Sequence, residues 1–164
     1  MSFLRFLSLL TLALWMGGLA SLGFVAAPTI FAVLESADPM GGRAEAGELF
    51  GAIFARFQQL AWMAGGAVVV LLILRAVLGP RPRPFAVRLS VAAVMLAASL
   101  VSGKVIAPRI DTIRVEAGSA VAALPDTDDR KAQFGRLHGL SNGLMLLTLL
   151  AGAWMLWVEM KDPH

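Results

Sequence analysis

The stretch Gly23-Phe24-Val25-Ala26-Ala27-Pro28-Thr29-Ile30 decides the fold, because it recurs 80 residues later as Gly103-Lys104-Val105-Ile106-Ala107-Pro108-Arg109-Ile110. The Gly, Val, Ala, Pro and Ile positions match between the two copies. Each copy lies at the end of a long apolar run, and a second apolar run follows it. The chain therefore looks like one helical hairpin written twice. Both copies run in the same direction, which predicts a parallel internal repeat.

Four apolar runs give the chain its class. They cover roughly Phe3–Ala27, Ile53–Leu78, Phe85–Ile106 and Leu137–Val158. Each run holds about 20 residues or more, the length that a helix needs to cross a hydrocarbon core about 30 Å thick. With 58% hydrophobic and 15% charged residues, the chain differs from an average soluble domain. The sequence predicts an all-α integral membrane four-helix bundle, a single domain over residues 1–164 in a lipid bilayer.

The connection between the second and third runs sets the expected orientation. Between Arg75 and Arg88 it carries four arginines and no acid, and its segment Gly79–Pro84 is too rich in proline to continue a helix. Short Arg-rich loops stay on the cytoplasmic side. We therefore expect a first hairpin over 1–78, a cytoplasmic Arg/Pro linker over 79–84 and a second hairpin over 85–164. Both termini are then cytoplasmic, in a bacterial inner (cytoplasmic) membrane.

Composition excludes several classes of function. The chain has no cysteine, so disulfides and thiolate metal sites are excluded. Its net charge is only +3 and its basic residues lie mostly beside the apolar runs, so nucleic acid is not an expected partner. None of the four runs has Asp or Glu at its centre, which argues against an ion-coupled pump. No catalytic constellation can be assembled within the runs, so the sequence does not predict an enzyme.

The predicted helices extend beyond the lipid. After Pro108, apolar residues continue at a spacing of three to four up to Leu124, which predicts an amphipathic continuation of the third helix. Pro125 then predicts a stop, and the acids of residues 126–129 predict the start of the fourth helix. We expect two antiparallel pairs of long helices whose non-cytoplasmic ends project into water.

Small residues at four-residue spacing predict close helix packing, since they let backbones approach where lipid gives no hydrophobic drive for association. Such positions are found on the first, second and fourth helices. They are Gly17 with Ser21, Ala61 with Gly65, and Gly139 with Gly143. Trp15 lies near the middle of the first run, and we expect it to fill the interior of the bundle.

A polar cluster is predicted near the outer ends of the helices. His138 and Asn142 begin the fourth apolar run at about the depth of Pro28 and Pro108, each of which frees a backbone carbonyl four residues earlier. A freed carbonyl in lipid needs a donor. The structural interpretation is that His138 donates to such a carbonyl and joins the hairpins. The predicted cluster comprises His138, Asn142, Gln58, Pro28, Pro108 and Trp15.

A metal site is the alternative interpretation of the same residues. His138, Asn142 and Met145 are spaced to share one helix face. Imidazole and thioether ligands together suit copper(I) or a haem iron. A complete site would need further ligands, such as Met16 or Met63, or a second subunit. The two hypotheses are thus a non-enzymatic structural or accessory subunit without a cofactor, which forms a homo-oligomer or binds a membrane protein, and a copper- or haem-handling protein that uses His138 and Met145.

Several segments also resemble a known family. They are Trp15-Met16-Gly17-Gly18 followed by Phe24, Pro28 and Phe31, Phe50-Gly51-x-x-Phe54, and Phe134-x-x-x-His138-x-x-x-Asn142. Together they are similar to the transmembrane-protein-205-like family, known in bacteria as a domain of unknown function, which implies a four-helix membrane protein without an established enzymatic activity. The first segment also resembles the copper resistance protein D family and the bacterial protoporphyrinogen oxidase. Those families place histidines in their early helices, where this chain has none.

Overall fold

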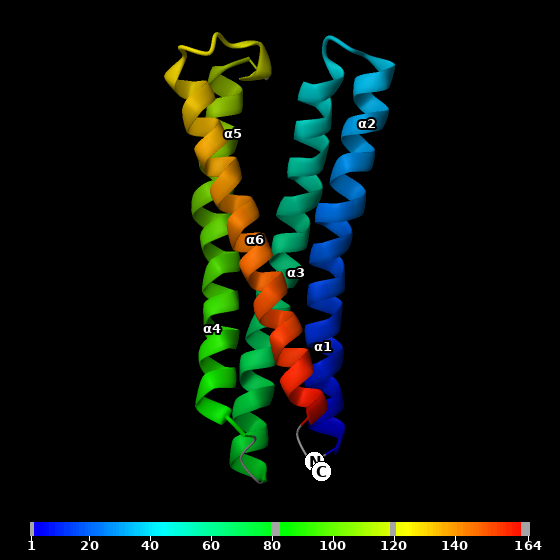
Figure 1. Ribbon diagram of the computed structural model, residues 1–164, viewed down its shortest axis with the longest axis vertical. Helices are drawn as coiled ribbons and strands as arrows, with labels where there is room; N and C mark the ends of the chain where they lie inside the picture. Colours follow the sequence, from blue (N-terminus) through cyan, green and yellow to red (C-terminus); the bar gives the residue numbers. More distant parts are fainter. Residues whose placement is uncertain (1, 80–82, 119–120, 162–164) are drawn as a thin grey trace.

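The computed structural model describes residues 2–79, 83–118 and 121–161. Its described elements are helical, and they form four long rods (Figure 1). The first rod comprises α1 (Ser2–Ser21), η1 (Leu22–Ala26) and α2 (Ala27–Ala37), and the second is α3 (Gly42–Leu78). The third comprises α4 (Phe85–Val101), η2 (Ser102–Ile106) and α5 (Ala107–Glu116). After the short 3-10 turn η3 (Val121–Ala123), α6 (Asp129–Lys161) is the fourth rod.

The predicted all-α four-helix bundle is confirmed. Each rod has 32 to 37 residues and contains a window with a mean hydropathy between 1.6 and 2.2, which is long and apolar enough to cross a membrane. Rods of that length measure about 48–55 Å, well above a hydrocarbon core of about 30 Å. The rods therefore extend past the apolar layer.

The two ends of the bundle differ. We call the end where α1 begins and α6 ends the terminus end, and the opposite end the hairpin end. At the terminus end the four rods pack together, whereas towards the hairpin end they separate into two arms, α2 with α3 and α5 with α6 (Figure 1). The buried core lies in the packed part and is built from Trp15, Val68, Leu72, Ala92, Met95 and Met155.

The prolines do not end their helices, because a π-helical turn precedes each of them. In η1 the Ala27 N–H donates to the Leu22 carbonyl, and in η2 the Ala107 N–H donates to the Ser102 carbonyl. Such a turn holds an extra residue and shifts the hydrogen-bond register next to Pro28 and Pro108, which have no N–H to offer. The rods therefore continue to Ala37 and Glu116.

The third rod ends earlier than its amphipathic pattern predicts. Gly118 has a φ of 64°, a left-handed conformation that stops a helix, so α5 ends at Glu116 and not near Leu124. The predicted start of the fourth helix is confirmed, because Asp128 accepts a hydrogen bond from the Arg130 N–H at 2.9 Å just before α6. The Arg130 side chain also donates to this carboxylate and thereby lowers the pKa of Asp128.

The expected linker over 79–84 lies partly outside the described residues, since positions 80–82 are not described. The internal repeat stays a prediction. The two π-helical turns nevertheless occupy equivalent positions, 80 residues apart, at the point where each octet of the predicted repeat begins to match.

Glycines allow close contacts between the helices. Only some of the glycines that the spacing predicts are among them. A Cβ at Gly65 would lie 3.0 Å from the Trp15 ring, and a Cβ at Gly103 would lie 2.6 Å from the Trp62 ring. By contrast, positions Gly17, Gly139 and Gly143 have open space within a single chain, and Ser21 is exposed. Of the predicted packing residues, Ala61 and Gly65 therefore pack inside the bundle. The others, Gly17, Ser21, Gly139 and Gly143, lie on its outer surface.

Adjacent glycines provide a test of this packing. Gly65→Leu should lower the midpoint of thermal unfolding in detergent by several degrees, because the new side chain must displace Trp15 and Leu96, and overpacking costs about 1–3 kcal/mol. Gly66→Leu is the matched control, since a Cβ at Gly66 meets nothing within 4 Å. Equal midpoints for the two variants would contradict the close approach at Gly65.

Candidate functional sites at the two ends of the bundle

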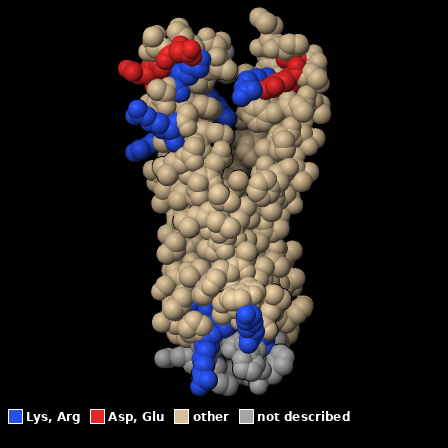
Figure 2. Space-filling model, in the orientation of Figure 1, with Lys and Arg blue, Asp and Glu red and all other residues tan. Residues whose placement is uncertain are grey.

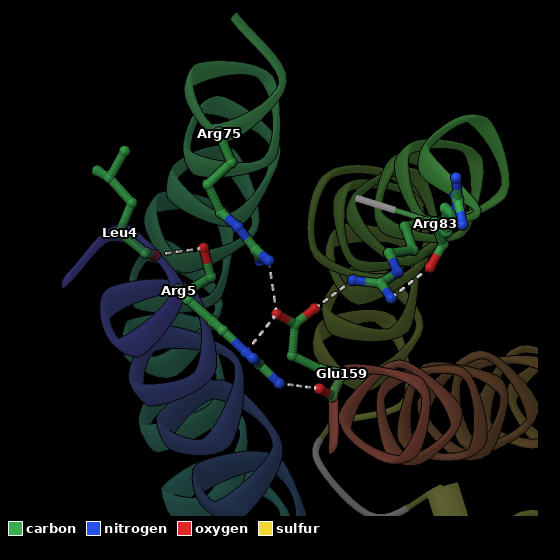
Figure 3. A network of polar contacts seen from close by, with 7 residues as sticks. Leu4, Arg5, Arg75, Arg83 and Glu159 are labelled. Carbon is green, nitrogen blue, oxygen red and sulfur yellow. Dashed lines mark hydrogen bonds and ion pairs between the residues drawn. The ribbon is translucent and has the colours of Figure 1, made fainter. Parts of the chain in front are cut away.

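A cluster of charged side chains joins the four rods at the terminus end (Figure 3). Each rod contributes one member: Arg5 from α1, Arg75 from α3, Arg88 from α4 and Glu159 from α6. We call these four residues the arginine–glutamate cluster. It holds together elements that are up to 154 positions apart in the sequence.

The Glu159 carboxylate is the centre of the cluster. Its Oε1 lies 2.7 Å from Arg75 Nη2 and 3.2 Å from Arg5 Nε, and its Oε2 lies 2.5 Å from Arg88 Nη1. Arg5 Nη2 donates to the Glu159 backbone carbonyl, and Arg88 Nη2 donates to the Arg83 carbonyl at 2.5 Å. Three guanidinium groups thus approach one carboxylate from three different helices.

Three of the four members of this cluster are buried, and Arg5 is half-buried. Arg88 is 1% exposed, and Arg75 and Glu159 are each 5% exposed. Taking an ion out of water costs several kcal/mol, and only close, well-directed partners offset that cost. The partners must therefore stay together, which fixes the relative positions of the four rods at this end.

Sequence reasoning assigned these arginines to membrane orientation and did not predict the cluster. A signal was present, because each buried member continues an inward stripe of its helix. Arg75 follows Gly65, Val68 and Leu72 at a spacing of three to four, and Glu159 follows Gly152 and Met155 in the same way. A charge that continues a buried stripe requires an opposite charge from a facing helix.

Removing the carboxylate should destabilise the bundle. Glu159→Gln leaves the buried guanidinium groups of Arg75 and Arg88, and the half-buried one of Arg5, without their common partner. We expect a loss of about 3–5 kcal/mol in the free energy of unfolding. Glu35→Gln is the control, because the Glu35–Arg43 pair has a comparable distance of 2.8 Å but lies exposed and should cost under about 1 kcal/mol. Denaturant unfolding in detergent measures both. A small effect of Glu159→Gln would show that the cluster does not hold the rods.

A hollow separates the two arms at the hairpin end, with basic side chains on both sides (Figure 2). We call it the interhairpin slot. Arg114 of α5 reaches across it, so that a Cβ at Gly47 or Gly51 of α3 would lie 3.1 Å from its guanidinium nitrogens. The same guanidinium lies 5.7 Å from the centre of the Phe134 ring of α6. Arg114 therefore touches both arms.

Aromatic pairs line the helices on both sides of this position. Phe134 and His138 stack with their ring centres 6.0 Å apart, and Phe50 and Phe54 stack at the same 6.0 Å distance. In the predicted repeat these two pairs match at an offset of 84 residues, at which Gly51 also matches Gly135. His138 is exposed, and among the described residues its contact is this stack. It makes no hydrogen bond there to a carbonyl that Pro28 or Pro108 frees four residues earlier.

A small cavity lies inside the bundle and has room for about one water molecule. Ser99 donates to the Gln58 side chain at 2.9 Å, and Ser102 and Ser141 are hydrogen-bonded at 3.1 Å. The cavity is lined by Trp15, Leu19, Phe54, Gln58, Ala98, Ser99, Ser102, Leu144, Met145 and Thr148.

The cavity brings together Trp15, Gln58 and Met145 from the predicted site residues. His138, Asn142, Pro28 and Pro108 do not line it. The sulfur of Met145 lies against Gly23, 2.9 Å from the position of a Cβ there. Among the described residues, no three His, Cys, Asp or Glu side chains come together as metal ligands would. The copper or haem site at His138 and Met145 stays a prediction.

Residues 10–119 match the family described as a domain of unknown function, DUF4149. The chain belongs to this family. The DUF4149 segment includes both π-helical turns, the arginines at positions 75 and 88, and Arg114, whereas α6 with Glu159 and His138 follows it. Comparisons with curated proteins and with solved structures found no significant match.

Proposed function

We propose that this DUF4149 protein is a non-enzymatic structural or accessory subunit of the bacterial cytoplasmic membrane, with both termini in the cytoplasm, and that it binds a membrane partner. One observation supports this best: the hairpins are joined by the arginine–glutamate cluster at one end and are separate at the other. A bundle that is fixed at one end presents its open arms in a constant geometry, which suits binding.

The charge distribution supports the proposed orientation. The terminus end carries Arg5, Arg75, Arg88 and Lys161, and its connection between α3 and α4 is short. Basic residues in short loops favour the cytoplasmic side. The hairpin end carries basic and acidic residues together, as in the pairs Arg43–Glu35 and Lys131–Asp126.

Orientation can be measured directly because the chain has no cysteine. In intact cells, Met40→Cys should react with a membrane-impermeant maleimide, since position 40 is 97% exposed between α2 and α3 at the hairpin end. Lys161→Cys, at the exposed end of α6, should react only after the membrane is permeabilised. The reverse labelling pattern would place the termini outside and contradict the proposal.

A second copy of the chain is the partner that the surface supports. Gly17 and Ser21 of α1, and Gly139 and Gly143 of α6, face outward with open space at the three glycines. Small residues at this spacing let two helices approach closely within lipid. Within a single chain these positions do not pack a helix, so a helix from another copy can pack there.

The double variant Gly139→Leu with Gly143→Leu tests self-association. Leucine side chains would hold a second helix away, so we expect the oligomer to dissociate to a monomer in light scattering on detergent-purified protein. Gly66→Leu is the matched control, because Gly66 also has open space but has valine four residues later. A wild-type monomer, or an oligomer that survives the double variant, would contradict self-association through this face.

A further inference from the structure

Arg114 differs from the arginines of the cluster in its partners. Its one ion pair among the described residues is with Asp111 Oδ1 at 3.6 Å, and that carboxylate is 66% exposed. In the described part of the chain, Arg114 donates no hydrogen bond. A guanidinium has five N–H donors in a fixed plane, which suits a carboxylate or a phosphate. Arg114 thus carries donors for an anion inside the slot.

The contacts around Arg114 hold its guanidinium in place. Its side chain is 23% exposed and lies between Gly47, Gly51 and the Phe134 ring. Any side chain larger than glycine at positions 47 or 51 would press on the guanidinium nitrogens at 3.1 Å. A cation that is held across a hollow in this way is already oriented for a ligand that enters the hollow.

The depth of Arg114 places it in a lipid headgroup layer. The uncharged stretch of α3 between Arg56 and Arg75 measures about 28 Å along the helix, close to a hydrocarbon core of about 30 Å. Gly51, which Arg114 contacts, lies about 36 Å from Arg75 along the same helix. The guanidinium therefore lies just beyond the hydrocarbon, whereas the cavity that Gln58 lines lies within it.

We propose that the interhairpin slot binds one anionic phospholipid. Its phosphate accepts hydrogen bonds from Arg114, and an acyl chain lies between the two arms, outside the one-water cavity that Phe54, Leu144 and Met145 line. The acyl chain is the expected occupant of the lower slot, because hydrocarbon surrounds the bundle at that depth and an inserted loop would leave polar backbone groups unsatisfied. This inference rests on the proposed orientation at one point only. With the termini in the cytoplasm, the headgroup layer at the hairpin end belongs to the outer leaflet.

Native mass spectrometry of the detergent-purified full chain tests the proposal. The protein is titrated with phosphatidylglycerol, with phosphatidylcholine and with oleate. Wild type should bind one phosphatidylglycerol about tenfold more tightly than phosphatidylcholine. Both lipids offer a phosphate, but the choline cation of phosphatidylcholine is repelled by Arg114 and leaves its headgroup without net negative charge. Arg114→Gln should lose this preference. Arg109→Gln is the matched control, since Arg109 is an exposed arginine on the same helix, and it should keep the preference.

A second pair of variants tests the geometry without changing charge. Gly51→Val should reduce phosphatidylglycerol binding as Arg114→Gln does, because its side chain displaces the guanidinium. Gly135→Val, at the equivalent and open position of α6, should leave binding unchanged.

Four results would overturn the proposal. If Arg109→Gln and Arg114→Gln lost the preference for phosphatidylglycerol equally, the preference would come from general surface charge and not from Arg114. Equal affinity for phosphatidylcholine would exclude selectivity for an anionic phospholipid. Displacement of phosphatidylglycerol by equimolar oleate would identify a fatty acid as the occupant. Loss of lipid binding when the chain dimerises would identify a second copy of the chain in the slot. None of these measurements depends on which way the chain faces in the membrane. Failure of the lipid proposal can therefore be told apart from failure of the proposed function.

Discussion

The structure depends on the Glu159 carboxylate, which three guanidinium groups from three other rods approach at once. An isolated buried carboxylate or an isolated buried guanidinium is too costly to retain, so each member of the cluster requires the others. The hydrophobic effect cannot align helices inside lipid, because lipid tails are as apolar as leucine. The cluster supplies the direction and register that apolar contacts cannot, and it does so at the end where all four rods meet.

Joining the rods at one end leaves the other end free to separate. The π-helical turns η1 and η2 lie where the arms begin to diverge, and each widens its helix directly before a proline. Because the turns absorb the missing N–H of the proline, the rods change course without breaking. The two hairpins thus leave a slot between them, and its mouth is aromatic and cationic.

Fold class was predictable because membrane insertion imposes length and hydropathy on each helix, and those properties are local. The ends of the helices were less predictable: a π-helical turn and a left-handed Gly118 depend on hydrogen bonds that no periodicity encodes. The site residues followed the same division. Trp15 fills the interior as expected, and Gln58 lies there too. The Glu159 carboxylate beside Arg75 and the Phe134 ring beside Arg114 lie on other helices, and they could not be assigned from spacing within one helix.

The arginines at the two ends of the bundle differ in the anion that each one contacts. At the terminus end a protein carboxylate lies in direct contact with buried guanidinium groups, and the result is a rigid junction. At the hairpin end Arg114 is similarly constrained, by a ring and by two glycines, yet its nearest carboxylate faces water at a longer distance. A guanidinium that is held in place without a close protein anion suits ligand binding. Its side chain has already lost its conformational entropy, and its N–H donors remain for a ligand. A rigid junction at one end is therefore what allows a preorganised cation to persist between the arms at the other.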